Sequence, residues 1–119
     1  MTTETILGLT VNGVPSGNYD GSSTNFDSNG VKGVGYYRGQ GSIQTVYQRI
    51  TGFQGIVVLQ ATLDQEWETA QWVDVNTFGD GSSVVSGTYP VSLTGNYTWL
   101  RAGIRDFTAG TIDSITVTY

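Results

Sequence analysis

Apolar and polar residues alternate most clearly over residues 96–119, near the C-terminal end of the chain. The apolar residues at every second position there are Leu100, Ala102 and Ile104. The aromatic and basic residues that fall between them are Trp99, Arg101 and Arg105. Because successive side chains of a β-strand point to opposite faces, this pattern predicts a half-buried strand with the apolar set inside. A short turn predicted at 108–110 (Thr-Ala-Gly) then makes the segment a hairpin of two strands.

The last strand of this hairpin contains a break in phase. Ile112 is out of phase with the apolar residues that follow it, which are Ile115, Val117 and Tyr119. We predict a β-bulge near 113–114 (Asp-Ser), because one extra residue would bring the later side chains back to the core face. A slip of one residue would otherwise expose the whole apolar set. The alternative is that Ile112 caps the end of the sandwich.

Short apolar runs separated by Gly, Asn and Asp turns fill the rest of the chain. Strands are predicted at 6–14, 24–27, 31–38, 43–50, 55–63, 72–78 and 84–93. Residues 52–55 are predicted as a tight connection and residues 64–71 as the only short helical turn, and the strand at 84–93 is predicted to break near Gly87 and Pro90. With the final hairpin this gives eight or nine short strands in a single domain over residues 1–119. The spacing predicts an all-β fold, an antiparallel β-sandwich or a jelly-roll-like barrel.

Composition argues against several classes of partner. Charged residues make up 13% of the 119 residues, the net charge is −5 and there is no Cys. Because phosphate binding needs a basic patch, we expect neither nucleic acid nor an anionic membrane surface as a partner. No apolar run approaches the ~18 residues of a membrane span. The first residues lack the basic and apolar character of a signal peptide, so we expect synthesis in the cytoplasm.

The residue types that usually carry catalysis are scarce. The chain has neither His nor Cys, which removes the commonest general base, the usual triads and most transition-metal sites. The carboxylates that could form a glycosidase-like pair are Asp64, Glu66, Glu68 and Asp74. Because a run of acids in one loop is more typical of a solvated surface, we expect no enzymatic activity.

The turns contain several aspartates, whose oxygen atoms are possible ligands for a calcium ion. The aspartates that lie in or next to turns are Asp20, Asp27, Asp74 and Asp80. Such loops can bind calcium, but no segment has the spacing of an EF-hand. Asp-Gly and Asn-Gly turns also need their Asp and Asn for backbone reasons alone. We therefore expect no cofactor, with a structural calcium ion as the alternative.

Aromatic side chains are the main candidates for binding a partner. The aromatic residues of interest are Tyr36, Tyr37, Tyr47, Trp67, Trp72, Tyr97 and Trp99. Trp72 is predicted to pack in the core. Trp99 is predicted on the outer face with Arg101 and Arg105, and Trp, Tyr and Arg are enriched at protein–protein hot spots. The candidate interface comprises Trp99, Arg101, Arg105, Tyr97 and Trp67, and its alternatives are a stacked Arg–Trp surface pair or a sugar-binding platform.

Three stretches of the segment Ile56–Tyr119 carry a resemblance to a known family. They read IVVLQATL, DQEWETAQWVDV and TGNYTWLRAGIRDFTAGTIDSITVTY. Together they resemble a recurring small β-sandwich domain of tailed-bacteriophage virion structural proteins. The run LRAGIRDFTAGTI is the most specific part, and it is a structural signature without a catalytic residue. Residues 1–55 carry no such resemblance.

The resemblance implies a non-enzymatic component of a phage virion. It would be a multi-copy capsid decoration or cement protein, or an accessory piece of the neck, tail or fibre. Its expected partners are other virion proteins and copies of itself, and its expected location is the virion, after synthesis in the host cytoplasm. The alternative function is a carbohydrate-binding module that adheres to a host-surface glycan, resting on Trp67, Trp72, Tyr36 and Tyr37.

Overall fold

The computed structural model of the chain describes residues 2–36 and 43–119. Within them it contains eight strands and a single 3₁₀ turn, and this confirms the all-β, antiparallel fold that the sequence predicts. The strands are β1 (Thr3–Leu7), β2 (Thr10–Val11), β3 (Phe26–Asp27), β4 (Val31–Lys32), β5 (Ile43–Thr62), β6 (Val73–Phe78), β7 (Val85–Thr94) and β8 (Trp99–Thr118), and the 3₁₀ turn is η1 (Val34–Tyr36).

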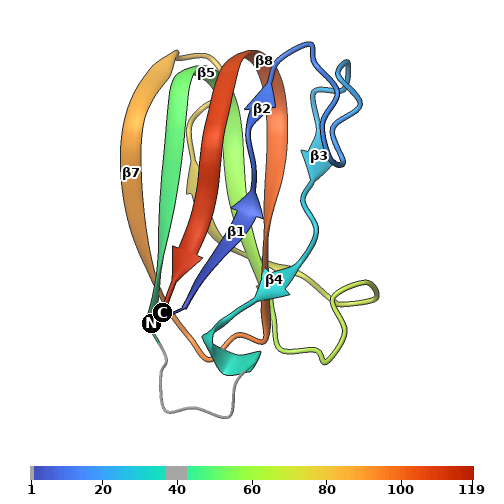
Figure 1. Ribbon diagram of the computed structural model, residues 1–119, viewed down its shortest axis with the longest axis vertical. Helices are drawn as coiled ribbons and strands as arrows, with labels where there is room; N and C mark the ends of the chain where they lie inside the picture. The colour runs from blue at the N-terminus through green and yellow to red at the C-terminus, as the bar shows by residue number, and fades with distance from the viewer. Residues whose placement is uncertain (1, 37–42) are drawn as a thin grey trace.

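Two strands of 20 residues each, β5 and β8, form the frame of the molecule. They pair antiparallel along their whole length, from Thr45 opposite Thr118 to Thr62 opposite Trp99. Both strands curve over at mid-length, so each contributes to both layers of the sandwich (Figure 1). One layer has the order β7, first half of β5, second half of β8, β1. The other has β6, second half of β5, first half of β8, with β3 and β4 at its edge.

The predicted hairpin turn at 108–110 and the predicted connection at 52–55 are both wrong. At these places β5 and β8 bend together instead of reversing direction, and their register shifts on both sides of Gln54. Gly52 has a φ of 60° and Gly110 a φ of 93°, which L-residues rarely adopt. A side chain at Gly110 would collide with the carbonyl group of Gly52. The glycines that suggested turns therefore serve a bend, which lets two paired strands turn a corner together.

The predicted bulge near residues 113–114 is confirmed. Ser114 lies opposite Arg49 and Ile112 lies opposite Ile50, so Asp113 is the extra residue of β8. The apolar residues on either side of it are fully buried, namely Ile112, Ile115 and Val117. The bulge therefore keeps both parts of the strand in phase with the core.

The core lies between the two layers and is filled by the inward residues of β5 and β8. Leu100, Ala102 and Ile104 are at most 1% exposed, as their alternation predicts. Phe107 lies near the bend and its ring contacts Tyr19, with ring centroids 5.4 Å apart. Because Tyr19 is buried, this contact ties the long segment between β2 and β3 to the core.

Three further expectations need correction. Residues 64–71 form bends and turns without a helix, and the 3₁₀ turn lies at η1 instead. β7 runs without interruption through Pro90, which an edge strand tolerates because its outward side needs no donor. The predicted strand at 31–38 is reduced to β4, and its last two residues lie outside the described residues. Among the described residues, no helix is long and apolar enough to cross a membrane.

Candidate functional site

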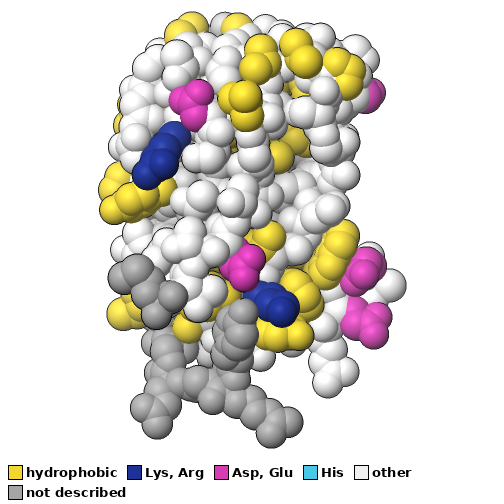
Figure 2. All heavy atoms as spheres, viewed as in Figure 1, with side chains coloured by type: hydrophobic (Ala, Val, Ile, Leu, Met, Phe, Trp, Pro, Cys, Tyr) yellow, Lys and Arg dark blue, Asp and Glu magenta, His cyan; other side chains and the backbone are white. Residues whose placement is uncertain are grey.

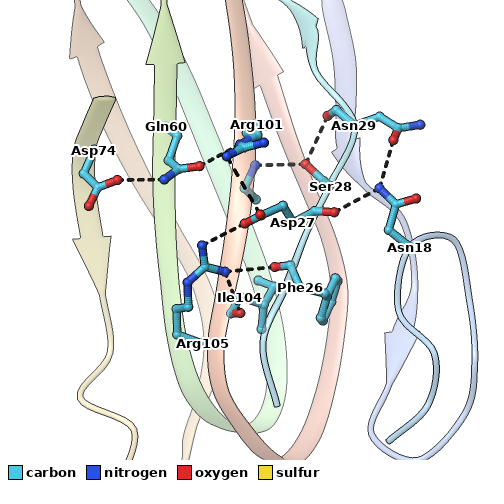
Figure 3. A network of polar contacts seen from close by, with 11 residues as sticks. Asn18, Phe26, Asp27, Ser28, Asn29, Gln60, Asp74, Arg101, Ile104 and Arg105 are labelled. Carbon is cyan, nitrogen blue, oxygen red and sulfur yellow. Dashed lines mark hydrogen bonds and ion pairs between the residues drawn. The ribbon is translucent and has the colours of Figure 1, made fainter. Parts of the chain in front are cut away.

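A polar ladder crosses the outer face of the layer that contains β6, β5, β8 and β3 (Figure 3). Asp74 accepts a hydrogen bond from Nε2 of Gln60 at 2.8 Å, and Oε1 of Gln60 accepts one from Nε of Arg101 at 2.6 Å. Asp27 then accepts a hydrogen bond from Nη2 of Arg105 at 2.8 Å and lies 3.8 Å from Nη2 of Arg101. We call these five residues the polar ladder. Its opposite charges are neighbours, so the ladder is compensated within the molecule.

The ladder also holds the short strand β3 against β8. Arg105 donates a second hydrogen bond to the carbonyl oxygen of Phe26 at 3.1 Å. The hydroxyl of Ser28 accepts one from the backbone N–H of Ala102 at 2.9 Å. A strand of two residues makes few backbone hydrogen bonds to its neighbour. The side-chain hydrogen bonds therefore stabilise the position of β3. Arg101 and Arg105 point to the outer face, as the alternation predicts, and they bind β3 and β5 there.

The other predicted interface residues also have contacts within the molecule. Nε1 of Trp99 donates a hydrogen bond to the carbonyl oxygen of Gln65 at 2.9 Å, and its ring meets Tyr36 edge-on at 5.2 Å. Trp67 packs so closely on Gly30 that a side chain there would collide with it. Tyr97 is half-buried in the loop between β7 and β8 and packs against the core cluster. Tyr37, also named as a sugar platform, lies outside the described residues.

The predicted position of Trp72 in the core is wrong. Its side chain is half-buried, and the guanidinium carbon of Arg101 lies 4.6 Å from its ring centroid. The next residue, Val73, lies opposite the buried Ala61 and therefore shares its inward face. Because strand residues alternate, Trp72 is placed on the outward side, where it stacks on Arg101.

Three of the candidate carboxylates, Asp20, Asp64 and Asp80, accept hydrogen bonds from backbone N–H groups. Asp64 accepts a hydrogen bond from the N–H of Gln71 at 2.8 Å. Asp20 and Asp80 each accept hydrogen bonds from two backbone N–H groups, and these bonds lower the pKa of each carboxyl to about 2. Both sit in an Asp-Gly-Ser-Ser sequence, at 20–23 and 80–83, a repeat that the sequence shows and that identifies the turn. No group of three or more potential metal ligands occurs in the described part of the chain.

A second surface, which the sequence reasoning missed, covers the outer face of the other layer. Cross-strand partners share a face; two rows of partners run across β1, β8, β5 and β7, and a third runs across β8, β5 and β7. The rows are Thr3–Thr118–Thr45–Ser92, Thr5–Thr116–Tyr47–Pro90 and Ser114–Arg49–Thr88. We call these residues the hydroxyl face. In Figure 2, which views this side, most of the surface over these strands is neither hydrophobic nor charged.

The centre of the hydroxyl face carries the two large side chains of these rows. Tyr47 is 43% exposed, and the guanidinium carbon of Arg49 lies 5.9 Å from its ring centroid. Arg49 is the one charged residue of the three rows. The signal in the sequence is Ser or Thr at every second position of several strands, as in Thr3 and Thr5 or Thr116 and Thr118. The shared face becomes recognisable only when the strand pairing places these strands side by side.

Three comparisons with known proteins found no match. No protein-family model matches it. No curated protein matches it either. No solved structure matches it.

Proposed function

We propose that this chain is a non-enzymatic structural protein of a bacteriophage virion, present in many copies, and that it docks on neighbouring protein subunits through the hydroxyl face. The observation that carries the proposal is that face. Two rows of partners across four strands and a third across three carry hydroxyl-bearing side chains almost throughout, with Tyr47 and Arg49 at the centre. The layer on the other side of the molecule carries the compensated polar ladder.

The Tyr–Arg pair at the centre of this face supports docking, whereas Ser and Thr are themselves under-represented among hot spots. Charged residues are depleted in the core of protein interfaces because their desolvation is unfavourable, and Arg49 is the one charged residue of the three rows, with Asp113 beside them in the bulge of β8. Ser and Thr have few rotamers to lose on association, and β-strands hold them in fixed rows. Tyr and Arg are the residue types that dominate binding energy, and a Tyr–Arg pair lies at the centre.

The edge beside this face favours docking by the face rather than by strand addition. β7 is an edge strand, since it pairs with β5 on one side only among the described strands. Pro90 lies in the middle of β7 and has no N–H to donate. Pro on an edge strand hinders pairing with another chain. Contact through the rows of side chains is therefore the mode that this layer supports.

The phage assignment rests on the resemblance of the segment Ile56–Tyr119. The sandwich is framed by two 20-residue strands, and the contacts of Trp99, Arg101 and Arg105 stabilise it. Trp67, Trp72 and Tyr36 each have an intramolecular neighbour against their rings, which favours protein contact over the glycan-binding alternative.

Mass spectrometry of purified virus particles tests the proposal. Particles from the strain that encodes the chain are banded in a density gradient, and the chain is quantified against the major capsid protein. We expect it to band with the particles at a ratio fixed by their symmetry. Absence from particles of a strain that expresses the chain would contradict the proposal, and a specific signal on a glycan array would support the alternative.

A further inference from the structure

A pocket of about 270 Å³ opens at one end of the sandwich, where β5 ends and β6 begins. Its apolar walls are Leu63, Val73, Val75 and Tyr97, and its polar rim includes Asp64 and Gln71. It lies on neither the hydroxyl face nor the polar ladder. Of the sequence-predicted interface residues, Tyr97 contributes to it.

The pocket is a continuation of the core that solvent reaches. Val73 lies opposite Ala61, and Ala61 lies opposite Leu100, so the three share the inner face of their layer. Ala61 and Leu100 are each 1% exposed, but Val73 is 62% exposed. Leu63, at the same end of β5, is 70% exposed. An inward-facing apolar surface is thus left open to an apolar group from outside.

The lining of this pocket includes one charged residue, the carboxylate Asp64. The segment 61–78 contains Asp64, Glu66, Glu68 and Asp74 and has neither Lys nor Arg. Asp64 lies on the rim itself, whereas Asp74 belongs to the polar ladder on the outer face. A cation placed beside Asp64 would therefore be attracted by its carboxylate, most strongly at low salt.

We propose that this pocket binds a segment of another protein that places a bulky apolar side chain in the pocket and a Lys or Arg beside Asp64. The apolar side chain covers Leu63 and Val73, and the cation complements the acidic rim. β6 is the last strand of its layer, paired with β5 alone among the described strands, so an extended segment can also bond to its open edge. This site goes beyond the proposed function, because the pocket and the hydroxyl face are separate surfaces and would bind different partner segments.

Amide chemical shifts of the isotope-labelled protein test the chemistry of the site. The probe is the peptide Ac-Gly-Lys-Phe-Lys-Gly-amide, and its controls replace both Lys by Glu or the Phe by Ser. We expect the probe to move the amides of Leu63, Val73 and Tyr97 saturably. Each control should bind about tenfold more weakly, and the difference between Lys and Glu should shrink on raising the salt from ~0.05 to ~0.5 M. Equal binding of all three peptides, or no shift at these amides, would overturn the proposal.

Two matched variants show whether the pocket itself is responsible. Val73→Lys and Val84→Lys change valines of nearly equal exposure, 62% and 63%, and Val84 does not line the pocket. We expect Val73→Lys to abolish the probe's shifts and Val84→Lys to retain them. Loss in both, or in neither, would contradict the site. A methyl pyranoside that moves the same amides when the peptide does not would assign the pocket to a sugar and overturn the proposal. None of these outcomes depends on the hydroxyl face, so the proposed function stands or fails separately.

Discussion

Gln44 and Gln48 lie four residues apart on β5, point into the core and are both 0% exposed. The amide of Gln44 is satisfied: its oxygen accepts from the N–H of Val34 at 3.0 Å and its nitrogen donates to the carbonyl of Gly95 at 2.8 Å. Neither amide atom of Gln48 has a hydrogen-bond partner in the described structure. A buried polar group without a partner is destabilising, so the two residues should respond in opposite ways to an apolar substitution.

We expect Gln48→Met to raise the free energy of unfolding by about 1–3 kcal/mol, because it removes two unsatisfied polar atoms and nearly preserves the volume. Gln44→Met should lower it by a similar amount, because it leaves the Val34 N–H and the Gly95 carbonyl without their partner. Urea unfolding of both variants measures the difference. A loss of stability in Gln48→Met would mean that its amide has a partner that the account misses.

Asp20 and Asp80 should make stability depend on pH. Hydrogen bonds from backbone N–H groups lower the pKa of both carboxyls from 3.8 to about 2 in the folded protein. A carboxyl with a lowered pKa stabilises the fold above its unfolded value, so this contribution is present above pH 4 and is lost as the pH falls toward 2. The urea midpoint of the variant Asp20→Asn/Asp80→Asn should change less than that of the wild type between pH 5 and pH 2.5. An identical pH profile would contradict the assignment.

The features that the sequence predicts correctly are those set by neighbouring residues within one strand. The alternation of Leu100, Ala102 and Ile104 placed the core face of β8, and the phase break at Ile112 located the bulge. Trp72 was misplaced because the residue's large apolar surface suggested burial, whereas the phase of its neighbour Val73 decides its side. The missing partner of Gln48 depends on packing across the sandwich, which no local pattern contains.

At the scale of elements, the bend shared by β5 and β8 decides the fold. A glycine that adopts a positive φ can serve either a hairpin turn or a bend within a strand. The sequence around it does not distinguish the two. The difference lies in the partner strand: β5 bends at Gly52 where β8 bends at Gly110, and the pair stays hydrogen-bonded on both sides. For this reason the hairpin and the connection were predicted at the right places but with the wrong geometry.

Alanine substitutions at the two bend glycines should separate backbone conformation from close approach. Gly110→Ala introduces a Cβ into the backbone of Gly52 at a φ of 93°, and we expect a loss of about 3 kcal/mol or more. Gly52→Ala has a φ of 60° and no atom within 4 Å of its Cβ, so it should lose only about 1–2 kcal/mol. Chemical unfolding compares the two. Equal losses would show that the strands do not touch at the bend as described.

At the scale of the molecule, the two layers have different outer surfaces. The polar ladder joins β6, β5, β8 and β3 and balances its charges internally, whereas the hydroxyl face is nearly uncharged. The sequence placed Trp99, Arg101 and Arg105 on an outer face, but their bonding to Gln65, Gln60 and Asp27 required the fold. The hydroxyl face was not predicted, because its rows combine residues from both ends of the chain, as Thr3 with Thr118.

The central claim is that the hydroxyl face docks on neighbouring subunits, and re-addition to depleted particles tests it most directly. Particles produced without the chain are mixed with the wild type, Tyr47→Glu, Val84→Glu or Trp99→Ala, and the bound protein is measured after sedimentation. The account predicts that Tyr47→Glu binds about 30-fold more weakly, the effect of a hot spot of about 2 kcal/mol, and that Val84→Glu binds like the wild type. Full binding of Tyr47→Glu together with loss in a folded Trp99→Ala would place the contact on the opposite layer and contradict the account.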